Sequence, residues 1–354
     1  MMLLAIDFDW GLLIEKGALI SVILGVSLLV AMYTTLAERK GAALLQDRRG
    51  PNRAGPFGLL QPLADGVKLF FKEEIIPTHA NKTLFIMGPM LAMLTAMMTS
   101  AVIPWGTPIH LFGRDINLQV ADVNIGILYI FGVVSMGVYG IMIGAWASNN
   151  KYSLMGGLRA ASQIISYELA MGISLIALLM CTGSLSLRDM VMQQQDGTWN
   201  VVLQPVGFLI FLICVFAECN RTPFDLPESE NELIGGYHTE YSSMKLGFYL
   251  FAEYINMFVS SAVISCLYFG GYDIPFVNDA QLATNMADIW VALLHVGMLM
   301  LKIAFFLFLF IWVRWTIPRF RYDQLMNLGW KKLIPLALLN MLITGAVILW
   351  YQNR

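Results

Sequence analysis

Long apolar segments separated by short polar ones dominate the pattern along this chain of 354 residues. Most of these segments are close to the ~20 residues that a helix needs to cross the hydrocarbon core of a bilayer. No segment shows a convincing strand pattern, so the expected fold is an all-α, polytopic membrane protein forming one domain over residues 1–354. The eight predicted spans cover about residues 17–37, 83–103, 124–147, 160–182, 201–218, 246–269, 288–312 and 334–351.

A short amphipathic helix is expected in the polar segment after the first span. Glycine and proline residues predict turns there, and from Leu63 onward apolar residues recur at the spacing of one helix face. The helix is too short to cross a membrane. Asp65 lies close in register to its apolar stripe. This placement favours a polar cavity lined by Arg39 or Arg48 over a helix that only lies flat on the membrane.

Composition supports the membrane class, since 58% of the residues are hydrophobic and only 13% are charged. The first 16 residues carry three acids and one lysine without a small-residue cleavage pattern. We therefore expect the first span to be a retained helix and not a cleavable signal peptide.

Lysine and arginine residues concentrate in the loops after the odd-numbered spans. These loops are residues 38–82, 148–159, 219–245 and 313–333. The other loops contain only Arg114 and Arg188, and the tails only Lys16 and Arg354. By the positive-inside rule, the four basic loops face the cytoplasm and both termini face outward.

The most acidic segment lies between the fifth and sixth predicted spans. Residues 217–233 hold five carboxylates and one arginine, and prolines on both sides of Phe224 and Asp225 prevent a regular helix. Ionisable groups beside a bilayer core are costly and mark ion pathways or charged ligands. A solvated acidic loop is the alternative. The adjacent apolar spans, and Glu253 inside the next one, favour a structured loop that enters the membrane.

Three ionisable residues, Glu168, Glu253 and Lys302, fall inside predicted spans, and Glu218 ends the fifth span. With the predicted orientation, the three glutamates share the cytoplasmic half of the bundle, with Lys302 expected as a charge partner at the inner end. This arrangement resembles a half-channel. Structural ion pairs that hold the helices in register are the alternative.

Smaller features complete the pattern. Gly140 and Gly144 have the spacing of a helix-packing face. The cysteines at 181, 214, 219 and 266 form no Cys-x-x-Cys pair and are expected to be small buried side chains. We expect no metal, haem, flavin, iron–sulfur cluster or nucleic acid bound by this chain, so electrons for any redox reaction must come from a partner.

Eight short motifs, in the same order and on the same loops, resemble the family of H subunits of the proton-pumping NADH:quinone oxidoreductases, the bacterial counterparts of NADH dehydrogenase subunit one of mitochondrial respiratory complex I. The resemblance covers nearly the whole chain. The motifs are residues 37–40, 49–52, 58–62, 151–154 and 158–160, Ile165-Ser166-Tyr167-Glu168, residues 217–226 with Asn220-Arg221-Thr222-Pro223-Phe224-Asp225-Leu226, and Pro318-Arg319-Phe320-Arg321-Tyr322-Asp323-Gln324-Leu325.

The resemblance implies a component of that enzyme whose cytoplasmic loops form much of a quinone chamber, and whose acidic residues begin a proton path. The implied chamber or entrance residues are Arg39, Arg48, Asp65, Arg221, Phe224, Asp225, Arg314 and Arg319. The implied proton-path residues are Glu168, Glu218, Glu228, Glu230, Glu232, Glu253 and Lys302. Coupled carboxylates suit this task, because quinone reduction consumes protons and brings negative charge into the chamber.

The implied substrate is a quinone, either ubiquinone or menaquinone. The implied partners are membrane lipids, the peripheral-arm iron–sulfur and quinone-site subunits, the small membrane subunits and the antiporter-like subunits. Two alternatives remain open: the membrane anchor of an energy-converting hydrogenase, which has no quinone, and a self-contained secondary transporter. The transporter would be expected to show paired repeats with interrupted helices, and none is visible here.

Overall fold

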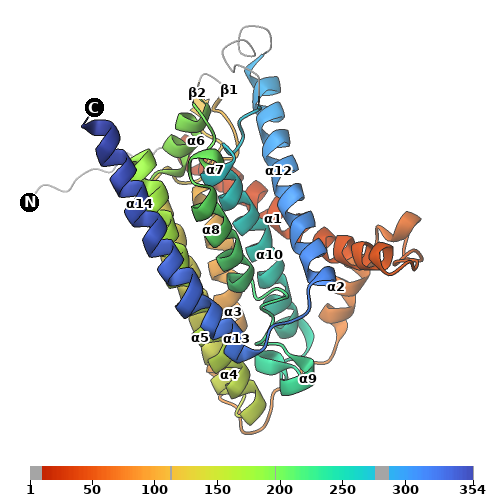
Figure 1. Ribbon diagram of the computed structural model, residues 1–354. Helices are drawn as coiled ribbons and strands as arrows, with labels where there is room; N and C mark the ends of the chain where they lie inside the picture. Colours follow the sequence, from red (N-terminus) through yellow and green to blue (C-terminus); the bar gives the residue numbers. More distant parts are fainter. Residues whose placement is uncertain (1–9, 112–113, 196, 276–286, 354) are drawn as a thin grey trace, which may run out of the picture.

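The computed structural model describes residues 10–111, 114–195, 197–275 and 287–353, without the side chains of Leu111, Glu230 and Asn231. Long helices lie side by side in a bundle, with the connecting segments at its two ends (Figure 1). Within the described residues, seven helices are long and apolar enough to cross a membrane, so the predicted all-α, multi-pass membrane protein is confirmed. They are α1 (Trp10–Leu45), α3 (Lys82–Thr99), α4 (Gly126–Ala147), α5 (Lys151–Thr182), α10 (Ser243–Tyr268), α12 (Asp288–Thr316) and α14 (Ile334–Gln352).

The predicted fifth span is a shorter, interrupted helix. It consists of α7 (Asn200–Leu203) and α8 (Pro205–Glu218), which meet at Gln204 in a non-helical conformation. Proline at the first position of α8 suits a helix start, because that position needs no backbone N–H. The 14 residues of α8 reach about 21 Å, less than the ~30 Å of a bilayer core. Its C-terminal end therefore lies within the bundle, beside the acidic loop.

Short elements connect the long helices. The predicted amphipathic helix is present as α2 (Gln61–Phe71). The expectation of no strands was wrong for one small hairpin, in which β1 (Ile109–Leu111) pairs antiparallel with β2 (Arg114–Ile116). Three-residue strands are too short to produce a recognisable alternation. The remaining elements are the 3₁₀ turns η1 (Pro56–Gly58), η2 (Ser100–Val102) and η3 (Gly236–His238), the helices α6 (Leu187–Gln195), α9 (Glu230–Leu233) and α13 (Tyr322–Leu328), and the π-helix η4 (Gly329–Leu333).

Capping residues determine where α5 begins and ends. Its first turn starts at Lys151, because the side chain of Asn150 accepts a hydrogen bond from the backbone of Tyr152 at 2.9 Å. It ends at Gly183, whose positive φ of 70° lets its N–H donate to Leu179 at 2.8 Å. The helix is therefore longer than the predicted span at 160–182, which marked only the apolar part.

Close packing of α3 and α4 confirms the helix-packing face predicted from glycine spacing. A Cβ atom on Gly88 would lie 2.7 Å from the Cα of Gly144. One on Gly144 would lie 1.9 Å from the hydroxyl of Tyr249, which donates to the carbonyl of Gly140 at 3.0 Å. The glycines let α3, α4 and α10 approach one another closely, and α10 lies mostly buried in the core.

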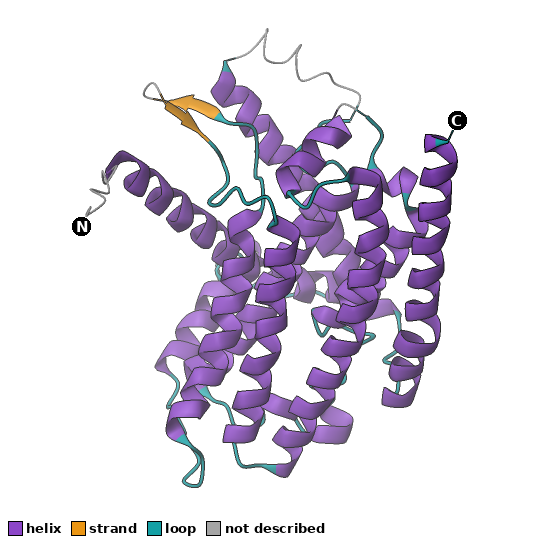
Figure 2. Cartoon of the chain, turned by 90° about the vertical axis from the view of Figure 1, so that its left-hand side faces the viewer, coloured by secondary structure: helices purple, strands orange, loops and turns teal. Residues whose placement is uncertain are grey.

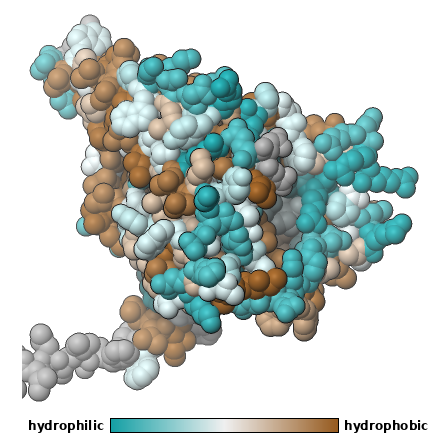
Figure 3. Space-filling view, turned by 90° about the horizontal axis from the view of Figure 1, so that it is seen from below, coloured by the Kyte–Doolittle hydropathy of each residue, from teal (hydrophilic) through white to brown (hydrophobic). Residues whose placement is uncertain are grey.

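The two ends of the bundle carry different loops. The α4–α5 turn, α9 and α13 lie at the lower end in Figure 1, whereas the β1–β2 hairpin and α6 lie at the upper end. Seen from below, hydrophilic side chains cover much of the right-hand part of the lower end, and hydrophobic ones gather along its left edge (Figure 3). The N-terminal part of α1 leans away from the other helices (Figure 2). Outward apolar side chains such as Trp290, Leu301 and Leu342 suit a lipid environment.

Candidate functional site

The acidic loop after α8 folds into the protein and not over its surface. Phe224 packs against Tyr167 of α5 and Phe320, with ring centroids 5.3 Å and 5.5 Å apart. The backbone N–H of Phe320 donates to the carbonyl of Pro223 at 3.1 Å. These contacts bury Arg221 and Asp225, which are 5% and 6% exposed. Two ionisable side chains are thereby held beside the helices of the bundle.

Glu38 of α1 forms the first part of the buried charge cluster. Its Oε1 lies 2.6 Å from Nη1 of Arg314, and its Oε2 lies 3.5 Å from Nη1 of Arg221. Tyr254 donates its hydroxyl to Oε2 of Glu38 at 2.9 Å, and the guanidinium of Arg221 lies 4.3 Å from the Tyr254 ring centroid. Glu38 was not predicted to belong to the site, although it precedes two basic residues at the end of an apolar span.

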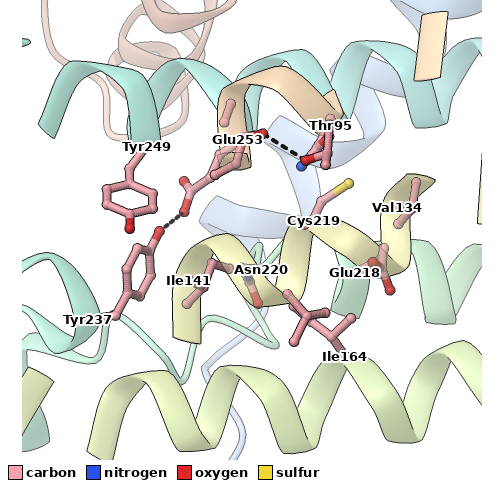
Figure 4. Close-up of a pocket in the computed structure, with 15 residues that line it drawn as sticks. Thr95, Val134, Ile141, Ile164, Glu218, Cys219, Asn220, Tyr237, Tyr249 and Glu253 are labelled. Atoms are coloured by element: carbon pink, nitrogen blue, oxygen red, sulfur yellow. Dashed lines mark hydrogen bonds between the residues drawn. The ribbon is translucent and has the colours of Figure 1, made fainter. Parts of the chain in front are cut away.

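The second part of the cluster joins two glutamates through a tyrosine. Nη2 of Arg221 lies 3.8 Å from Oε2 of Glu253. The hydroxyl of Tyr237 lies 2.9 Å from Oε1 of Glu253 and 3.1 Å from Oε1 of Glu228. Figure 4 shows the Tyr237 hydroxyl pointing at Glu253 across a pocket that Glu218 also lines. Nδ1 of His238 lies 3.5 Å from the same Oε1 of Glu228.

Asp225 completes the cluster at its more exposed edge. Its Oδ2 accepts a hydrogen bond from Nη2 of Arg319 at 2.8 Å, and Nη1 of Arg319 donates to the Ser229 hydroxyl at 3.2 Å. Burial and the charge of Glu228 raise the pKa of Asp225 to about 6, although Arg319 and two other arginines lower it. Burial also disfavours the charged form of Glu228. Hydrogen bonds and the charges of His238 and Arg221 nevertheless hold its pKa below the ordinary value.

The cluster holds one more carboxyl group than it holds guanidinium groups. Its four carboxyl groups are those of Glu38, Asp225, Glu228 and Glu253. Its three guanidinium groups are those of Arg221, Arg314 and Arg319. A buried carboxylate without a charge partner is costly, and neighbouring carboxylates share protons for this reason. With the His238 imidazole beside Glu228, these groups lie close enough to hold a proton and exchange it among themselves.

Three cavities surround this cluster. One of about 200 Å³ lies between α1, α2 and α10, and its polar lining includes Glu38, Arg39, Asp65 and Tyr254. Its apolar lining consists of Met32, Pro62, Leu69, Leu250 and Phe251. Oδ2 of Asp65 lies 2.6 Å from Nη1 of Arg39, which shows which of the two candidate arginines it contacts. Glu38 and Tyr254 therefore belong both to this cavity and to the charge cluster.

The other two cavities meet at Glu218. Each has a volume of about 40 Å³; the first is lined by Glu218 and Glu253, and the second by Glu168 and Glu218. This volume is enough for one or more water molecules. Oε2 of Glu218 is buried and has no hydrogen-bond partner among the described residues. Glu168 accepts a hydrogen bond from the Ser135 hydroxyl. The three glutamates thus follow one another along two small cavities, of which the one between Glu218 and Glu168 has a mostly apolar lining.

Known proteins resemble this chain over almost its whole length. The profile of the NADH dehydrogenase family matches residues 18–345. The chain belongs to this family. The first of the NADH-quinone oxidoreductase H subunits of Cytophaga hutchinsonii is 66% identical over 339 residues, covering 96% of this chain and 98% of that protein. The NADH-quinone oxidoreductase H subunit of Flavobacterium johnsoniae is 65% identical over 337 residues, covering 95% and 96%. The resemblance found in the sequence is confirmed.

Several residues that the resemblance to the NADH dehydrogenase family singled out lie outside the cluster. Arg48 is exposed and donates to the side chain of Gln46 at 2.8 Å. Nη1 of Arg159 donates to Glu232 at 2.5 Å. The side chain of Glu230 lies outside the described residues.

The expectation that Cys181 is buried was wrong, because it is exposed near the end of α5. No group of three or more histidine, cysteine or acidic side chains in the described part of the chain could hold a metal ion.

The predicted pairing of Lys302 with the glutamates was wrong. This residue was expected to be a charge partner of the glutamates, but its Nζ donates to the carbonyls of Phe269, Gly271 and Asp273 at 2.7–2.8 Å. A helix leaves its last carbonyls without partners, and the negative end of its dipole attracts a cation. Only the Phe269 carbonyl stands at the end of α10. Those of Gly271 and Asp273 belong to the segment that follows, so Lys302 holds this segment at the C-terminal end of α10. Its depth along the span was estimated correctly, but depth does not reveal which end of a neighbouring helix a side chain reaches.

Proposed function

We propose that this chain is the membrane subunit of an NADH-quinone oxidoreductase, in which it forms much of the quinone chamber and carries an acidic path for protons. The names of its relatives support the enzyme. The observation that supports the coupling role is the order of the cavities. The cavity between α1, α2 and α10 shares Glu38 with the charge cluster, and the two smaller cavities lead from Glu253 past Glu218 to Glu168.

The quinone reaches the cavity between α1, α2 and α10. A quinone has an apolar tail and two ring oxygens that accept hydrogen bonds. The apolar side chains of Met32, Leu69 and Phe251 suit the tail, and Arg39 can donate to a ring oxygen. Both ubiquinone and menaquinone fit this chemistry. Partner subunits complete the chamber and supply the electrons from their iron–sulfur clusters.

Reduction of the quinone then drives proton movement. Two electrons bring negative charge close to Glu38, which lines the cavity and contacts Arg221 and Arg314. The added negative charge disfavours the ionised form of the neighbouring carboxyl groups. The cluster therefore takes up protons or redistributes those that it shares. Water in the two small cavities carries protons past Glu218 to Glu168.

In the membrane, the charge cluster lies on the cytoplasmic side and both termini lie outside, as the lysine and arginine distribution predicts.

Glutamine and aspartate substitutions at two path positions test this function. Glutamine preserves size but cannot carry the proton, so Glu218→Gln and Glu168→Gln should each lower NADH-driven quinone reduction at least about ten-fold per assembled enzyme. Aspartate at either position should retain part of the rate. Electron transfer from NADH to a soluble artificial acceptor should not change, because that acceptor is reduced in the peripheral arm.

The matched control is Glu73→Gln, since Glu73 is an exposed glutamate outside the path. If the glutamates only form structural ion pairs, the glutamine variants will lower the amount of assembled enzyme but leave the turnover of the remainder normal. Normal turnover and normal proton pumping in both glutamine variants would refute the proton-path role.

A further inference from the structure

Tyr237 is fixed between the acidic loop and the bundle by its backbone as well as its ring. It follows Gly236, whose φ of 60° and close approach to Pro227 leave no room for a side chain: a Cβ atom there would lie 1.6 Å from the Pro227 carbonyl oxygen. The carbonyl of Tyr237 accepts a hydrogen bond from Ser153 of α5 at 2.9 Å. The side chain is only 1% exposed, so its hydroxyl has a fixed position.

That hydroxyl lies between two carboxyl groups, which compete for its one proton as hydrogen-bond acceptors. It can donate to Glu253 at 2.9 Å or to Glu228 at 3.1 Å, but not fully to both. A phenol oxygen can also accept a hydrogen bond from a protonated carboxyl group. When one of the two glutamates carries a proton, the three groups form a complete chain along which that proton can move.

Two neighbouring tyrosines are hydrogen-bonded differently. Tyr241 and Tyr249 are also buried and pack edge to face, but their hydroxyls donate to the backbone carbonyls of Phe85 and Gly140. Bonds to helix carbonyls hold helices together and offer no ionisable acceptor. Of these three tyrosines, Tyr237 is therefore the one whose hydroxyl contacts carboxyl groups.

His238 links Glu228 to the surface of the protein. Its side chain is 22% exposed, and its Nδ1 lies 3.5 Å from Oε1 of Glu228, within ion-pair distance. Nδ1 has no hydrogen-bond partner among the described residues. Imidazole is the side chain best suited to exchange protons with water near neutral pH. A path from solvent to Glu253 thus runs through His238, Glu228 and Tyr237.

We propose that Tyr237 relays protons between Glu228 and Glu253, and that His238 delivers them from the surface; this rests on the proposed function. The imidazolium of His238 gives its Nδ1 proton to the carboxylate of Glu228. Protonated Glu228 passes a proton to the Tyr237 oxygen while the original hydroxyl proton moves to the carboxylate of Glu253. The hydroxyl is restored, no electrons move, and the net change is one proton transferred from solvent to Glu253.

The test compares Tyr237→Phe with Tyr241→Phe in the assembled oxidoreductase. Both changes remove a buried hydroxyl from the same aromatic cluster, but only the first removes a contact to carboxyl groups. Tyr237→Phe should lower NADH-driven quinone reduction and proton pumping about ten-fold or more and increase the solvent isotope effect. Tyr241→Phe should keep the turnover per assembled enzyme within about two-fold of normal and leave the isotope effect unchanged, because it acts on packing alone.

His238→Ala provides an independent readout. It should lower the rate several-fold, and added imidazole should restore most of the loss, which a purely structural role for His238 would not allow. The relay is wrong if Tyr237→Phe behaves like Tyr241→Phe, or if imidazole does not rescue His238→Ala. Should Glu218→Gln and Glu168→Gln still abolish coupled turnover in that case, only the relay fails. Normal turnover in the glutamine variants would instead reject the proton path itself.

Discussion

Asp225 offers a quantitative test, because two neighbours act on its pKa in opposite directions. Its carboxyl group is 9% exposed, burial and Glu228 raise its pKa to about 6, and Arg319 at 2.8 Å lowers it. The folded protein therefore binds this proton more tightly than the unfolded chain, where an aspartate pKa is about 3.9. Its stabilising contribution is full below about pH 4 and is lost as the pH rises to about 6, a change of about 3 kcal/mol.

Removing each neighbour should move the pKa of Asp225 by a predictable amount. An opposite charge at hydrogen-bond distance lowers a carboxyl pKa by about 1–3 units, so Arg319→Gln should raise it from about 6 to above 7. Asp225 is then protonated at neutral pH. Removing the like charge with Glu228→Gln should lower the pKa of Asp225 by about one unit or more.

The assay is the pH dependence of NADH-driven quinone reduction per assembled enzyme. If ionised Asp225 is needed, the rate falls below about pH 6 in the unaltered protein. This acid limb should move toward neutral pH in Arg319→Gln and to lower pH in Glu228→Gln. Because Glu228 also belongs to the proposed relay, the position of the limb and not the maximal rate is the readout. Limbs that move in the same direction, or a limb that persists in Asp225→Asn, would refute the reasoning.

Two further predictions concern the cluster and the topology. Glu38→Gln leaves Arg221 and Arg314 without their shared partner, which should cost about 3–5 kcal/mol and reduce the intact enzyme on native gels, whereas Glu38→Asp should lose less. Reporter fusions or cysteine labelling should place residues near 50 and 325 in the cytoplasm and residues near 195 outside. A cytoplasmic signal near 195 would reverse the predicted orientation.

The membrane helices could be predicted because length and apolar content suffice to identify them. Their ends could not, since they depend on single capping residues such as Asn150 and Gly183. The break at Gln204 was missed, although Pro205 favours a helix start there, because α7 and α8 are both apolar and no charge separates them. A hydropathy pattern reports where a helix is stable in lipid and not where its hydrogen bonds begin.

The candidate site was only partly predictable. The cost of a buried charge pointed to Glu168, Glu218 and Glu253 without any knowledge of their contacts. Glu38 and Tyr237 were missed, because their importance comes from contacts between different elements. Tyr237 lies only 9 and 16 positions from Glu228 and Glu253, but in the separate turn η3. Tyr254, which donates to Glu38, lies 216 positions from it. Periodicity and spacing describe single helices, so contacts between helices have to come from the structure.

Glu38 is the residue through which the cavity can act on the proposed proton path. It lines the cavity, and it also lies 3.5 Å from Arg221, whose guanidinium reaches Glu253 at 3.8 Å. Negative charge that appears in the cavity competes with Glu38 for its arginines, and any shift of Arg221 changes the field at Glu253. Arg221 is almost fully buried, so water screens this effect weakly. One shared guanidinium thus lies between the cavity and Glu253, where the proposed proton path begins.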